Sequence, residues 1–182
     1  MKDFVIGIQT RIGLNDQNIR ATVTTFADAA IINIGCFDYK DIFEFNHRVA
    51  NLSNNQLGFF TNTRDGLEKG QLSLELCGYN NNARRIIILI TDGIANKGIG
   101  EEKGLFKASL EIKAKGTIIQ AVTVGDDLYN VLERTMIPPT NIYSLNYLNL
   151  DEVVNNVCGN NDSRKGINSK NKSIYDFLNS NI

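Results

Sequence analysis

Apolar positions along this chain follow two spacings, one typical of helices and the other of strands. Residues 19–26 and 30–37 are rich in β-branched side chains and are separated by a short link, which predicts an antiparallel hairpin. Residues 41–52 show helical spacing, with Asp41 as the expected N-cap. Residues 1–14 also predict a helix, whose start carries no cap and which we interpret as the last part of a longer helix. Its apolar face consists of Phe4, Val5, Ile8 and Ile12.

The second half of the chain alternates regularly between helix and strand patterns. Residues 85–91 contain an unbroken apolar run, which predicts a strand buried on both faces in the middle of a parallel sheet. A helix is expected before this strand, in the segment that follows Thr63. After it we expect a helix over 101–115 that ends at Gly116, a strand over 118–124, a helix over 128–136, a strand over 141–145 and a helix over 150–157.

This alternation predicts a three-layer α/β/α domain with an open, mostly parallel sheet. The hairpin near the start adds one antiparallel edge strand. The apolar pattern ends at residue 158, so we expect one domain over residues 1–158. Residues 159–182 are dominated by Asn, Ser, Lys and Gly, and we predict a polar, disordered tail there.

Composition removes several classes of function. The 182 residues suit one domain, and a net charge of −1 offers no basic surface for nucleic acid. No stretch reaches the roughly 20 apolar residues that span a bilayer. Neither nucleotide-binding glycine motif is present, a G-x-S-x-G elbow is absent, and His47 is the only histidine. An enzyme is therefore not the first expectation.

Side chains suited to a hard cation follow the predicted strands. Asp92 and Gly93 come directly after the apolar run of residues 85–91, and Thr61 and Thr63 lie in a second strand-to-helix loop. In open α/β sheets, ligands bind beyond the carboxyl ends of the strands. Carboxylate and hydroxyl oxygens are suitable ligands for Mg²⁺, so we consider Mg²⁺ as a cofactor.

Four segments resemble the von Willebrand factor A (VWA) and integrin I-type domain family. They are residues 19–28 (IRATVTTFAD), 61–67 (TNTRDGL), 85–93 (RIIILITDG) and 118–125 (IIQAVTVG), in the order of the family. The resemblance covers about residues 1–160 and implies a Rossmann-like fold. It also implies a metal-ion-dependent adhesion site that uses Asp92 and Thr61, with a ligand-binding rim formed by Gly93, Thr63 and Asp126.

The chain departs from the family pattern at its start. The family's metal site begins with Asp-x-Ser-x-Ser at the end of a first, central strand, and no such motif occurs in this sequence. The resemblance thus implies a sheet without its first central strand, and an incomplete site. Three arrangements stay open: the flanking strands close up, a partner supplies a strand, or the chain is a truncated gene product, which we expect.

Asp92 and Thr63 also have structural interpretations. Asp92 can form an Asx turn or a helix N-cap, and Thr63 can cap the helix that follows it, which we favour over a binding role for Thr63.

The resemblance implies a non-enzymatic domain that binds a protein or an extracellular-matrix ligand. One alternative is a degenerate scaffold that binds no metal. Another is a metal-dependent α/β enzyme that uses Asp92 together with Asp28 or Asp126.

An extracellular or secreted location is expected, with any signal peptide upstream of this sequence. Three sequons, at Asn51, Asn161 and Asn171, are candidate glycosylation sites in such a location. Three cysteines leave two alternatives open, a disulfide with one thiol left over or buried free thiols.

Overall fold

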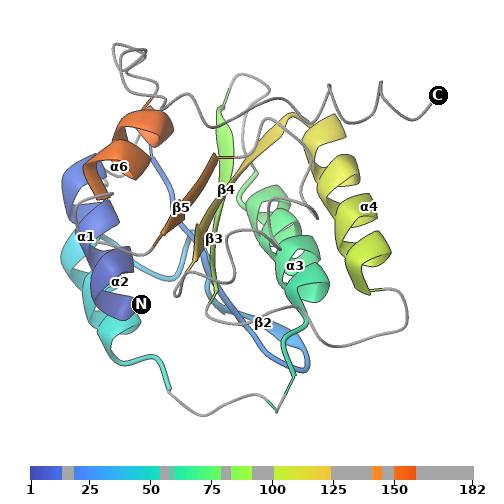
Figure 1. Ribbon diagram of the computed structural model, residues 1–182. Coiled ribbons are helices and arrows are strands. Elements are labelled where there is room, and N and C mark those ends of the chain that lie inside the picture. Colours follow the sequence, from blue (N-terminus) through green and yellow to red (C-terminus); the bar gives the residue numbers. More distant parts are fainter. Residues whose placement is uncertain are drawn as a thin grey trace.

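The helices and strands are stacked in three layers. The computed structural model describes residues 1–13, 19–53, 58, 60–78, 83–91, 101–123, 141–144 and 150–158. Helices α1, α2 and α6 cover one face of the strands, and helices α3 and α4 cover the other (Figure 1). The elements are α1 (Lys2–Ile12), β1 (Val23–Phe26), β2 (Ala30–Ile34), α2 (Ile42–Ala50), α3 (Thr63–Leu76), β3 (Arg85–Thr91), α4 (Glu101–Ala114), β4 (Thr117–Thr123), β5 (Asn141–Ser144) and α6 (Leu150–Cys158).

The predicted order of elements is confirmed wherever the prediction falls on described residues. The hairpin is antiparallel, and Phe26 pairs with Ala30 next to its turn. Asp41 is the N-cap of α2, with its Oδ1 accepting a hydrogen bond from the Glu44 backbone N–H at 2.8 Å. Gly116 follows α4 with a φ of 79°, a left-handed conformation that suits glycine. The predicted helix over 128–136 and the predicted disordered tail over 159–182 lie outside the described residues.

The described strands form two sheets, which agrees with the predicted open sheet that lacks its first central strand. Strands β1 and β2 make a two-stranded antiparallel sheet, while β3, β4 and β5 make a three-stranded parallel sheet in that order. Arg85 pairs with Thr117 and Thr91 with Thr123, so β3 and β4 are aligned over their full lengths. Among these strands, β1 and β3 each have a hydrogen-bonded neighbour on one side.

Both faces of β3 are covered, as predicted, because Ile87 packs with the α3 and α4 side chains and Ile88 and Ile90 pack with those of α1 and α6, but most of its residues are only half-buried. Only Leu89 and Thr91 of β3 are buried, and its other residues are half-buried. In β4, which has a neighbour on each side, every residue except Ile118 is buried. The apolar sequence of β3 fits a central position, but its single described neighbour leaves one side of the strand accessible.

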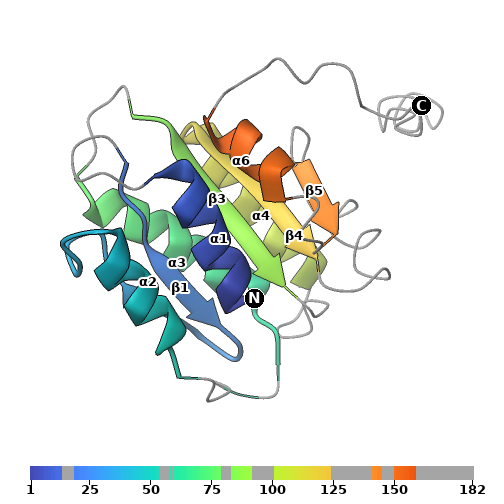
Figure 2. The same cartoon turned by 90° about the vertical axis from the view of Figure 1, so that its left-hand side faces the viewer.

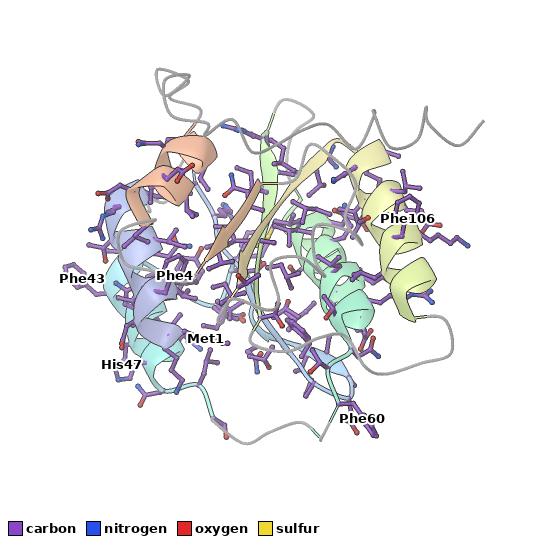
Figure 3. The ribbon with its side chains drawn as sticks, in the orientation of Figure 1. Met1, Phe4, Phe43, His47, Phe60 and Phe106 are labelled. Atoms are coloured by element: carbon purple, nitrogen blue, oxygen red, sulfur yellow. A yellow bond between two sulfur atoms is a disulfide. The ribbon has the colours of Figure 1, made fainter. Side chains whose placement is uncertain are left out.

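Three apolar clusters hold the layers together. The first joins α3 and α4 to β3 and β4 and is centred on Leu67 and Ile119. The second packs Phe4 and Ile8 of α1 and parts of α6 on the opposite face of β3 and β4. The third joins α2 to the hairpin and is centred on Phe45. Figure 3 shows Phe4 directed toward the strands and Phe43 directed away from them. Within the described residues, no helix has the length and apolar character required to cross a membrane.

A disulfide between Cys36 and Cys77 decides between the two cysteine alternatives. The bond links the segment after β2 to the residue that follows α3, with the two Cα atoms 5.8 Å apart. Cys158, at the end of α6, is a free and exposed thiol. The hairpin is therefore covalently attached to the helix that packs against both sheets.

Candidate functional site

Helix α3 runs opposite to the strands and brings its N-terminus to their carboxyl ends. Near the end of α3, Ser73 Oγ lies 2.7 Å from Thr22 Oγ1, just before β1 begins. Near its start, α3 packs against Phe26, the last residue of β1. The loop that contains Thr61 precedes α3 and therefore lies at this carboxyl edge, as predicted for a ligand site in an open α/β sheet.

Backbone hydrogen bonds fix this loop against the hairpin turn. The Asn62 N–H donates to the Ala27 carbonyl oxygen at 2.7 Å, and the Phe60 N–H donates to Asp28 Oδ1 at 2.8 Å. The side-chain amide of Asn62 donates to the Asp28 carbonyl oxygen at 3.3 Å. The position of Thr61, which lies between Phe60 and Asn62, is therefore determined from both sides.

A further contact comes from the first turn of α3. Asp65 Oδ2 accepts a hydrogen bond from the Ala30 N–H at 2.6 Å. Together with Asp28, this residue uses its carboxylate to join the loop to the hairpin, and we did not single out Asp65 from the sequence. Each of the two carboxylates therefore has one oxygen engaged in a hydrogen bond to a backbone N–H.

The cap of α3 is Asn62, so the interpretation of Thr63 as its cap is wrong. Asn62 Oδ1 accepts a hydrogen bond from the Asp65 N–H at 3.1 Å. Thr63 is the first residue of the helix and its side chain is buried, with 1% exposed. Thr61 is half-buried and is therefore the more exposed residue of the two. The rim role of Thr63 stays a prediction.

The remaining predicted site residues are placed only in part. Asp92, Gly93 and Asp126 lie outside the described residues. Thr91, directly before Asp92 in the sequence, is the buried last residue of β3. Strands β1 and β3 run in the same direction, so Thr91 and the loop of Thr61 share the carboxyl edge (Figure 2).

The three candidate glycosylation sites are also placed only in part. Asn51 is the exposed C-cap of α2, where its amide donates to the His47 carbonyl oxygen at 2.8 Å. Asn161 and Asn171 lie outside the described residues. Glycosylation at the three sequons stays a prediction.

The described donor set fits only part of a metal shell. No group of three or more His, Cys, Asp or Glu side chains suited to a metal ion occurs in the part of the chain that the structure describes. Thr61 offers a hydroxyl, whereas Mg²⁺ requires near-octahedral coordination by oxygen. A full shell would therefore need Asp92 and further oxygens in addition to Thr61.

Asn62→Ala is expected to lower the free energy of unfolding by about 1 kcal/mol, since the substitution removes a helix cap. Asn62→Asp retains the oxygen that caps the helix and loses only the amide that donates to the Asp28 carbonyl oxygen. We therefore expect it to lower the free energy of unfolding less than Asn62→Ala does. Urea unfolding of both variants measures the difference. Equal losses in the two variants would show that the cap is not the important contact.

Comparisons with known proteins agree on one fold. The family model for the von Willebrand factor type A domain matches residues 1–156. A search of curated proteins finds no match. Among solved structures, proximal thread matrix protein 1 from the mussel byssus is 24% identical with a TM-score of 0.66, covering 86% of this chain and 39% of that chain.

Two other solved structures contain metals according to their descriptions. The mussel protein with a zinc-occupied MIDAS motif is 22% identical with a TM-score of 0.67, covering 86% of this chain and 41% of that one. The manganese-loaded TRAP protein of Plasmodium vivax is 16% identical with a TM-score of 0.63, covering 84% of this chain and 61% of that one. At these identities the likeness establishes the fold, and this chain spans about two fifths of the mussel chains.

Proposed function

The chain belongs to the von Willebrand factor type A domain family, and on that premise we propose that it is a non-enzymatic domain that binds a protein or an extracellular-matrix ligand. The observation that supports this function most is the fixed position of the Thr61 loop at the carboxyl edge of the strands. Hydrogen bonds hold the loop before any ligand arrives, so little order has to be gained on binding.

We propose a divalent metal, Mg²⁺ in the first instance, as part of this function. Asp92 and Thr61 would hold it, and Gly93, Thr63 and Asp126 would form the rim around it. A bound divalent ion with an open coordination position would attract a carboxylate oxygen of the ligand. The zinc and manganese named for the two structural neighbours support a divalent ion in this fold.

A metal-free scaffold is the second candidate, because the sequence contains no Asp-x-Ser-x-Ser motif. The third candidate, an enzyme that uses Asp92, would need a nearby second carboxylate. Asp28 is one of its two candidates, and its Oδ1 already accepts a hydrogen bond from the Phe60 N–H. We therefore place the enzyme last.

An extracellular or secreted location is part of the proposal. Disulfides form and persist mainly in oxidising compartments, because intracellular reductants keep thiols reduced. The Cys36–Cys77 bond supports such a location. The exposed amide of Asn51 is then a candidate for glycosylation.

Calorimetric titration with Mg²⁺ and with Mn²⁺ tests the metal site. The titration is run on this chain and on a form with a strand ending in Asp-x-Ser-x-Ser joined ahead of Met1. We expect the longer form to bind, Asp92→Ala to abolish binding and Thr61→Ala to weaken it strongly. Thr10→Ala, which alters an exposed threonine on α1, is the matched control and should bind as the parent does.

Two results would decide against parts of this proposal. If neither form binds either ion while circular dichroism shows both folded, the metal is wrong and the scaffold alternative holds. If Asp92→Ala binds as well as its parent, the assigned ligand is wrong.

A further inference from the structure

The solvent side of helix α2 carries a row of three side chains that ends at a sequon. Phe43, His47 and the C-cap Asn51 follow one another at intervals of four residues, which places them along one side of the helix. The buried residues of α2, Phe45 and Val49, lie on the opposite side. Figure 3 shows Phe43 and His47 directed away from the strands. We call Phe43, His47 and Asn51 the α2 row.

The sequon at the end of this row is accessible and has a fixed backbone. Asn51 and Ser53, the two residues of the Asn-x-Ser pattern that define an acceptor site, are both exposed. Lys2 of α1 holds the backbone around them, because its Nζ donates hydrogen bonds to the carbonyl oxygens of Ala50, at 3.1 Å, and of Leu52. The acceptor asparagine therefore has a defined place at the end of α2.

The side chain of Asn51 is folded back along the helix. Its Nδ2 donates to the His47 carbonyl oxygen at 2.8 Å and lies 3.1 Å from His47 Nε2. An N-linked glycan is attached to this nitrogen of the asparagine side chain. A glycan on Asn51 therefore begins beside His47 and starts in the direction of Phe43.

Attachment of a glycan leaves this side-chain direction available. A bond forms between Asn51 Nδ2 and the first carbon of an N-acetylglucosamine, whose bond to a lipid-linked pyrophosphate breaks. The pyrophosphate leaves with the bonding electron pair, and Nδ2 loses one proton to the transferase. Since the amide nitrogen carries two N–H groups, one remains and can still donate to the His47 carbonyl oxygen.

The length of the α2 row matches two sugar rings. Eight residues separate Phe43 from Asn51, which corresponds to about 12 Å along the helix axis, or roughly two turns. Each 1,4-linked pyranose ring covers about one helical turn. The first sugar therefore lies over His47, and the second reaches Phe43.

Phe43 offers an apolar surface for the second sugar. It is the most exposed of the large apolar side chains that the structure describes, with 80% of its surface accessible. One face of an N-acetylglucosamine ring carries several C–H groups, and such a face packs on an aromatic ring because both surfaces are then removed from water. A sugar on Phe43 would bury an apolar ring that the protein fold leaves in solvent.

We propose that Asn51 is glycosylated and that the first two sugars of its glycan lie along the α2 row, with the second sugar stacked on Phe43. The glycan then covers the outer side of α2, so a protein ligand does not bind there. This inference rests on the extracellular or secreted location proposed above and does not depend on a metal.

The test uses the full chain secreted from eukaryotic cells, with Asn161→Gln and Asn171→Gln so that Asn51 is the acceptor that remains. Mass spectrometry of the peptide that contains Asn51 measures occupancy, and we expect most of the chain to be glycosylated. An endoglycosidase that cleaves between the first two sugars gives the matched form without the second sugar. A secreted chain without a sugar on Asn51 overturns the inference.

Proton NMR locates the second sugar. Stacking on Phe43 places its protons in the ring current, so we expect some of its resonances upfield of those of the free glycan. Phe43→Ala should remove this shift, and Phe43→Tyr should retain it because a ring is still present. Phe106→Ala, which removes an exposed phenylalanine on the other side of the strands (Figure 3), is the matched control and should retain it too. Identical sugar resonances in the parent and in Phe43→Ala overturn the stacking.

Urea unfolding measures what the stacking contributes. We expect removal of the second sugar to raise the unfolding equilibrium constant about fivefold in the parent, the size of one aromatic contact. In Phe43→Ala the same removal should change it less than about twofold, as for an exposed surface change. Equal changes in the two chains overturn the stacking. The metal titration can be run on the chain made without glycans, so failure of one proposal is distinguishable from failure of the other.

Discussion

Phe45→Ala is expected to lower the free energy of unfolding by about 3–5 kcal/mol, the usual loss for a large aromatic side chain removed from a core. Phe45 is fully buried, with 0% of its surface exposed. It packs with Ile34 of β2 and Val49 of α2, and its ring lies edge-on to that of Tyr39, with centroids 5.0 Å apart. The substitution therefore leaves a cavity between α2 and the hairpin.

The same helix offers a matched control. Phe43 is two residues earlier, is 80% exposed and points away from the strands (Figure 3). Phe43→Ala is expected to change the free energy of unfolding by no more than about 0.5 kcal/mol. Urea unfolding with an unchanged slope measures both variants. Similar losses for the two positions would show that α2 is not packed as described.

Replacement of both Cys36 and Cys77 by serine is expected to lower the free energy of unfolding by about 4 kcal/mol. The disulfide closes a loop of 41 residues, and cross-linking a loop of this length removes that much conformational entropy from the unfolded chain. The reduced chain gains this entropy on unfolding, so the folded state becomes less favoured. The comparison is made by urea unfolding without reductant.

Cys158→Ser is the control for this prediction, because Cys158 is exposed and unpaired. It should unfold at the same urea concentration as the parent chain. Addition of a reductant should destabilise the parent and Cys158→Ser alike and should leave the double variant unchanged. Resistance of the parent chain to reductant, with the double variant equally stable, would contradict the prediction.

The sequence predicts those parts of the fold in which local pattern and tertiary environment agree. The helix capped by Asp41 has both a preferred cap residue and an apolar face, and it forms as predicted. The run at residues 85–91 is rich in β-branched residues, which favour a strand, and it forms β3. How completely that strand is buried depends on neighbours distant in sequence, and for this reason the local pattern predicted its covered faces but not its half-buried residues.

The candidate site was harder to predict for similar reasons. Thr61, Asn62 and Thr63 are all residue types that can cap a helix, so composition alone did not identify Asn62. The sequence did offer one signal for this cap, since Asn62 stands three residues before Asp65, whose N–H its side chain can accept. The role of Asp65 depends on a contact with the hairpin 35 residues away, which no local pattern indicates. Likewise, which two of the three cysteines form a disulfide depends on which two lie close together in space, and the sequence alone does not show this.

The division of the strands into two sheets affects how the domain holds together as one cooperative unit. No ladder of backbone hydrogen bonds connects the described hairpin to β3, so the two halves depend on side-chain packing under α1 and α3. Parts of a domain can open locally at a lower free energy than global unfolding requires. The Cys36–Cys77 bond keeps the hairpin attached to α3 when such an opening occurs. We therefore expect the hairpin half to open locally at a lower free energy than the whole domain unfolds, which native-state hydrogen exchange measures.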